Sequence, residues 1–161
     1  MAFGRLAPYS KFPLTTGNTY PLFYDPAAGA GARQEEMMGV AASIAADSTW
    51  VLMWAMPPTL PSGTMKLELR FRTSATTGNT KVNPKWDGVA INASPAAATL
   101  SAEGTTTTAA AGTAHVPTQI KINLDATSIA AGEILAMHLV FETASWTLAA
   151  QSGWQAWIIW E

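Results

Sequence analysis

The chain contains no cysteine, only two histidines and few charges among its 161 residues. The absence of cysteine excludes disulfides, thiol chemistry and cysteine-ligated metal sites. Charged residues make up 12 % of the chain and the formal net charge is −2, whereas about a quarter of an ordinary soluble domain is charged. A nucleic-acid-binding protein carries a basic patch or stripe, so this charge balance argues against nucleic acid as a partner.

Long apolar runs are also missing. No stretch approaches the roughly twenty apolar residues that a membrane-spanning helix needs. The N-terminus lacks an apolar run followed by a small-residue cleavage site, so we expect no secretory signal and no membrane partner. We expect the chain to be made and kept soluble in the cytoplasm. Its length leaves room for one domain with a full core.

Catalytic motifs are equally scarce. His115 and His138 have no second histidine at a metal-ligand spacing, and the chain has no GxSxG elbow and no phosphate-binding glycine loop. Paired carboxylates are needed for glycoside hydrolysis, but Glu68 lies between Lys66 and Arg70, which indicates a solvated, charge-balanced face. We therefore predict that the protein is not an enzyme and has no catalytic residues, no metal site and no cofactor.

Alternating apolar and polar residues predict several strands. The clearest is 65–72, and similar alternation occurs at 118–124 and 134–141. The stretches 49–57 and 154–160 are apolar on both faces, so we expect them in the middle of a sheet or beneath another subunit. Seven to nine strands with no convincing helix predict an all-β fold. The specific prediction is a single jelly-roll β-sandwich of about eight antiparallel strands.

The first 36 residues are rich in proline, glycine and aromatic side chains. We predict an extended N-terminal arm at 1–36 with one short strand at 19–24, followed by the sandwich domain at 37–161. The arm is too apolar for a free tail and is expected to contact a neighbouring subunit. The expected arm contacts are Phe3, Tyr9 and Phe12.

Seven tryptophans are the richest feature of the composition. They could pack in the core, bury a subunit contact or stack on sugar rings. Trp86 in "NPKWDG" and Trp146 in "TASWT" lie next to loop signals, which makes them the candidate contacts for a ligand or partner. The candidates for the core or a subunit interface are Trp50, Trp54, Trp154, Trp157 and Trp160.

Three phrases follow one another before the closing "WQAWIIWE": "PSGTMKLELRFRTSATTGN", "VNPKWDGVAI" and "SIAAGEILAMHLVFETAS". In this order, over residues 48–161, they resemble the single jelly-roll proteins of tailed-phage virions, of the capsid decoration (cement) or head-fibre type. The resemblance implies a non-enzymatic structural protein that is made in the host cytoplasm. It would act as a homotrimer that binds the major capsid protein, or another virion protein, on the outer capsid surface. The alternative is a carbohydrate-binding or receptor-binding β-sandwich module of a phage tail or fibre, with a glycan as its ligand.

Overall fold

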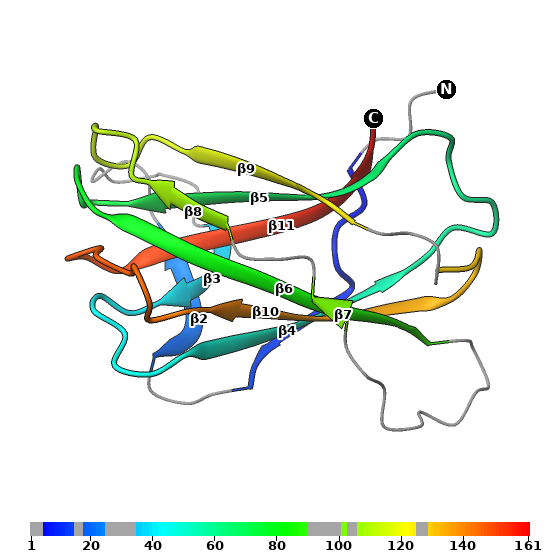
Figure 1. Ribbon diagram of the computed structural model, residues 1–161, viewed down its shortest axis with the longest axis horizontal. Coiled ribbons are helices and arrows are strands. Elements are labelled where there is room, and N and C mark those ends of the chain that lie inside the picture. Colours follow the sequence, from blue (N-terminus) through cyan, green and yellow to red (C-terminus); the bar gives the residue numbers. More distant parts are fainter. Residues whose placement is uncertain (1–4, 15–17, 25–34, 90–100, 103–105, 125–128) are drawn as a thin grey trace.

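The computed structural model describes residues 5–14, 18–24, 35–89, 101–102, 106–124 and 129–161. Within these ranges the chain forms strands and no helix (Figure 1). The strands are β1 (Ser10–Pro13), β2 (Thr19–Tyr24), β3 (Glu35–Val40), β4 (Ser48–Ala55), β5 (Met65–Thr73), β6 (Asn79–Val89), β7 (Ser101–Ala102), β8 (Thr106–Ala109), β9 (Thr118–Asn123), β10 (Ile134–Phe141) and β11 (Ser152–Trp160).

The strands form two antiparallel sheets that pack face to face. The six-stranded sheet has the order β1-β4-β10-β6-β7, with β8 also paired to β6, and the five-stranded sheet has the order β2-β3-β11-β5-β9. β11 lies between β3 and β5, in agreement with its apolar residues on both faces. The predicted all-β jelly-roll sandwich is confirmed. Short strands in the N-terminal and threonine-rich segments raise the number of strands above the expected eight.

The core fills the space between the two sheets. Alternate residues of each strand point inward, so Phe71 of β5 and Phe141 of β10 both pack against Trp154 of β11. The rings of Phe71 and Trp154 are stacked with their centroids 4.5 Å apart. Each fully buried large side chain contributes about 1.5–3 kcal/mol by leaving water, so this layer accounts for much of the stability of the fold.

The N-terminal segment differs from the expected arm, because its described residues pair within the chain's own sheets. β1 pairs with β4 and β2 pairs with β3. Leu6 exchanges two backbone hydrogen bonds of 2.9 Å with Ile158 of β11, and the indole Nε1 of Trp54 donates to the Leu6 carbonyl oxygen. β3 accompanies β11 only as far as Trp154, so the Leu6 segment pairs with β11 beyond that point.

Two of the three expected arm contacts can be placed in the structure. Tyr9 is 58 % exposed and Phe12 is 43 % exposed, on the edge of the six-stranded sheet. Phe3 lies outside the described residues. The N-terminal segment thus contributes backbone pairing to the sandwich and leaves apolar side chains on its surface.

Candidate functional site

Glu68 of β5 lies at the centre of a cluster of polar side chains on the outer side of the five-stranded sheet. Its side chain is only 2 % exposed, so the predicted solvated position is wrong. Arg5 contacts both carboxylate oxygens, at 2.7 and 3.1 Å, and Arg70 Nε donates to Oε1 at 2.9 Å. Gln119 of β9 donates to the same oxygen at 2.8 Å. The carboxylate is buried because the two guanidinium groups and the amide cover it.

These contacts keep Glu68 ionised. Burial by itself would raise its pKa, but hydrogen bonds from Arg5 and Gln119 and the charges of Arg5 and Arg70 outweigh burial and lower the pKa below its ordinary value. The pKa of Glu161 is lowered too, by hydrogen bonds from Lys121 and Lys66. Both carboxylates are therefore negatively charged at neutral pH, and neither holds a proton that could be given to a leaving group.

Trp157 lies next to this cluster, on the outer side of β11 and directly opposite Glu68 in the strand register. Its side chain is half-buried. The guanidinium carbons of Arg5 and Arg70 lie 5.3 and 5.6 Å from the centre of its ring system. Cation–π attraction at this range holds an indole in one orientation. Two guanidinium groups, both bound to Glu68, thus lie over the ring and fix it on the surface.

We call this surface the Trp157 face. It consists of the outward side chains of β5, β9 and β11, the terminal residue and Arg5, which crosses from the N-terminal segment. The aromatic ring is accompanied by the amide of Gln119 and the guanidinium groups of Arg5 and Arg70, whose positions are fixed by hydrogen bonds that they donate to the Glu68 carboxylate. Its members are Arg5, Lys66, Glu68, Arg70, Arg72, Gln119, Lys121, Asn123, Gln155, Trp157, Ile159 and Glu161.

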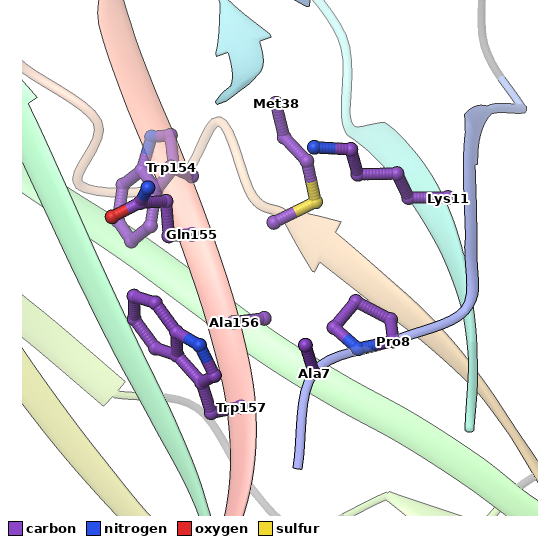
Figure 2. Close-up of a pocket in the computed structure, with 8 residues that line it drawn as sticks. All are labelled: Ala7, Pro8, Lys11, Met38, Trp154, Gln155, Ala156 and Trp157. Atoms are coloured by element: carbon purple, nitrogen blue, oxygen red, sulfur yellow. The ribbon is translucent and has the colours of Figure 1, made fainter. Parts of the chain in front are cut away.

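A pocket of about 180 Å³ opens beside Trp157, where the N-terminal segment passes β11. Figure 2 shows Ala7 and Pro8 across the pocket from Trp157. The pocket lies between the last pair of β3 with β11, at Trp154, and the bridge from Leu6 to Ile158. In an antiparallel strand alternate residues direct their N–H and C=O groups to the same side. Since Ile158 bonds Leu6, the backbone of Ala156 also faces this pocket.

A second hollow of about 240 Å³ is lined by Arg5, Glu68, Gln119, Lys121, Ile159, Trp160 and Glu161. It is therefore a charged hollow at the end of β11, whereas Lys11 and Gln155 are the polar side chains that line the pocket beside Trp157. Within the described ranges, no group of three or more histidine or acidic side chains could hold a metal ion.

The structure places most of the predicted tryptophan sites away from the Trp157 face. Trp50, Trp54 and Trp154 are at most 2 % exposed and belong to the core. Trp160 is half-buried and packs against the core. Their inward direction follows from the alternation along β4 and β11.

The two tryptophans expected to contact a ligand do not form a site in the described structure. Trp146 is only 8 % exposed and meets Phe141 edge to face at 5.9 Å, so its interpretation as a surface platform is corrected. The segment after β10 turns its indole inward instead of outward. Trp86 lies in β6 opposite Met137, and its side chain is outside the described part.

Comparisons with known proteins support the fold. No family model and no curated protein matches the chain. Among solved structures, an arabinose-bound α-L-arabinofuranosidase is 12 % identical with a TM-score of 0.53, over 98 % of this chain and 26 % of that one. A family 11 carbohydrate-binding module from a cellulase of Clostridium thermocellum is 10 % identical with a TM-score of 0.47, over 100 % of this chain and 97 % of that one. At 12 % identity the similarity to the arabinofuranosidase concerns the fold alone.

The structure has no helix in its described ranges that is long and apolar enough to cross a membrane. The sequence analysis assigned Trp157 to the core or a subunit interface, whereas the structure places it half-buried on the outer side of β11. Arg5 and Gln119 were missed as members of the site. The alternating pattern of β9 does direct Gln119 outward, whereas no local signal links Arg5 to Glu68, 63 residues away.

Proposed function

We propose that this chain is a non-catalytic carbohydrate-binding β-sandwich and that the Trp157 face binds the saccharide. The observation that carries this proposal is the half-buried indole of Trp157, fixed among amide and guanidinium groups. One side of a sugar ring presents C–H groups that pack on an aromatic ring, while its hydroxyls need donors and acceptors nearby. Few polar groups of fixed orientation beside an apolar surface are typical of small-molecule sites.

The state of the carboxylates supports binding without catalysis. A glycosidase needs one carboxylic acid whose raised pKa lets it protonate the leaving oxygen, and a second carboxylate across the bond. Glu68 and Glu161 both have lowered pKa values because cations surround them. Their role in this proposal is to hold Arg5, Arg70, Lys66 and Lys121 in position for the ligand.

A glycan array tests the proposal. The wild-type protein should bind at least one class of saccharide, and Trp157→Ala should lose that signal while Trp157→Tyr keeps part of it. Phe12→Ala is the matched control, since it removes an exposed aromatic ring from the other sheet. Thermal melting checks that each variant is folded. Binding that survives in Trp157→Ala but disappears in Phe12→Ala would contradict the proposed site.

A second candidate function is contact with another virion subunit, the role that the sequence resemblance implies. Exposed Tyr9, Phe12 and Leu14 favour it, since these apolar side chains lie in or beside β1, the edge strand of the six-stranded sheet. A homotrimer that binds the major capsid protein would cover these side chains. Light scattering should then give the mass of three chains, falling to one in Phe12→Ser. A wild-type monomer that does not sediment with capsid shells would remove this candidate.

A further inference from the structure

The charge of the Trp157 face differs in sign from that of the whole chain. Among the side chains that the structure describes, four cations on this face bind two carboxylates, which leaves an excess of two positive charges, while the chain as a whole has a formal net charge of −2. The four cations are Arg5, Lys66, Arg70 and Lys121. A local excess of one sign on an otherwise acidic protein concentrates ligands of the opposite charge at that surface.

Each carboxylate on the face is shared by two cations. Glu68 binds Arg5 and Arg70, and Glu161 binds Lys66 and Lys121. One negative charge cannot neutralise two positive ones, so each cluster stays cationic. Arg72, further along β5, also has a partner within the chain. Cationic side chains therefore occur at several points along β5, at Lys66, Arg70 and Arg72.

A second aromatic ring lies at the far end of this surface. Tyr20 of β2 pairs with Gly39 of β3, and its ring lies against the sheet there, because a Cβ on Gly39 would come within 2.7 Å of ring carbon Cε2. The ring is half-buried. Burial raises the pKa of Tyr20, so its hydroxyl stays protonated and donates to Gln151 Oε1 at 2.9 Å. Because Gly39 has no side chain, the ring of Tyr20 can pack directly against the backbone on the outer side of the sheet.

The two rings are too far apart for one sugar. Gly39 pairs with Gly153 of β11, four residues before Trp157, which corresponds to roughly 13 Å along a strand. Arg72 lies opposite Gly153 and Arg70 lies opposite Gln155. A ligand that contacts both rings must therefore be an extended chain, and it passes two guanidinium groups on the way. Guanidinium groups bind carboxylates with two parallel hydrogen bonds.

We infer that the ligand is an extended acidic glycan, a chain of uronic acid residues, with sugar faces on Tyr20 and Trp157 and carboxylates at Arg70 and Arg72. This inference rests on the proposed function. A nucleic acid fits less well, since single- and double-strand binders neutralise many more phosphates than two excess charges allow.

Calorimetric titration with oligogalacturonate and with its fully methyl-esterified form tests the inference, because the two ligands share one shape and differ in charge. The acid should bind roughly tenfold or more tightly than the ester. Raising the salt concentration from about 50 to 500 mM should weaken the binding of the acid but not that of the ester. Arg72→Gln should reduce the difference between acid and ester, while Lys85→Gln, on the six-stranded sheet, should leave it unchanged. Arg70→Gln is the second variant, with melting as its folding check.

The outcomes distinguish failure of the acidic-glycan inference from failure of the proposed carbohydrate-binding function. Equal binding of acid and ester, lost in Trp157→Ala, would overturn the inference and leave the proposed function standing. Binding of neutral glucans or galactans alone would have the same meaning. Failure of every glycan to bind would overturn both. Tighter binding of a single-stranded oligonucleotide than of the uronate would also overturn the inference.

Discussion

Replacing Glu68 by glutamine should measurably destabilise the sandwich. The change keeps the size of the side chain but removes the charge that accepts hydrogen bonds from Arg5, Arg70 and Gln119. The new amide nitrogen is a donor and would face these donors in a site that is only 2 % exposed. A hydrogen bond to a charged group contributes about 1.5–3 kcal/mol. Arg5 and Arg70 are partly exposed, so solvent screens their charges and we expect a loss of about 2 kcal/mol.

The expected change in melting temperature follows from this loss. For a domain of this size, 1 kcal/mol corresponds to about 2–4 °C, so Glu68→Gln should melt roughly 4–8 °C below wild type at pH 7. Unfolding in urea gives the free energy of unfolding of each variant, and because urea is uncharged it does not screen the ion pairs of Glu68. Glu142→Gln is the matched control, because Glu142 bonds one cation, Lys81 at 3.1 Å, on the other sheet. The control should lose no more than about 1 kcal/mol.

The same variant predicts a pH dependence. Because the folded protein lowers the pKa of Glu68, the carboxylate contributes stability that is complete above its ordinary value of 4.5 and is lost as the pH falls through the folded pKa. The difference between wild type and Glu68→Gln should therefore be constant above about pH 5 and shrink in more acidic solution. Equal melting at pH 7, or a difference that persists undiminished at low pH, would refute the stabilising role of this cluster.

Other changes test the packing of the sandwich. Trp154→Ala should cost about 3–5 kcal/mol, measured by urea unfolding, because the indole is fully buried against Phe71. Gly39→Ala should lower the melting temperature at a cost of about 1–3 kcal/mol, because the added methyl group would meet both the backbone oxygen and the ring of Tyr20; unchanged melting would contradict this tight contact between β2 and β3. Deleting residues 1–14 should cause a large loss of melting temperature, since Leu6 and β1 pair with β11 and β4, whereas a free arm would leave melting unchanged.

Strands with a clear pattern could be predicted from the sequence because burial imposes a period of two. The alternation over 65–72 predicted a half-buried strand, and its buried face in β5 includes Met65 and Phe71. The two-faced apolar character of 154–160 predicted a place in the middle of a sheet or beneath another subunit, and β11 lies in the middle of its sheet. The site was harder to predict from the sequence, because its residues come from distant parts of the chain. Glu68 looks solvated beside its neighbours in sequence, and only Arg5 and Gln119, from other segments, explain its burial.

Two other differences have similar physical causes. Trp146 follows loop signals, but irregular segments have no periodicity that fixes side-chain direction, and burial against Phe141 decides the outcome. Prolines and aromatics in the first 36 residues predicted an arm, yet the need of β11 for a backbone partner past Trp154 brings Leu6 into the sheet. Pairing between segments that are distant in sequence cannot be predicted from the composition of either segment.

The most direct measurement of the central claim follows the indole N–H signals of the ¹⁵N-labelled protein by NMR during titration with a glycan that the array identifies. Trp157 is the tryptophan that the structure places on the outer side of the five-stranded sheet, whereas Trp50, Trp54 and Trp154 are buried. Our account predicts that the Trp157 signal moves with saturation, together with the backbone signals of Gln155 and Arg70, while the buried indoles stay in place. Saturable shifts confined to β1 and β4, with Trp157 unmoved, would contradict it.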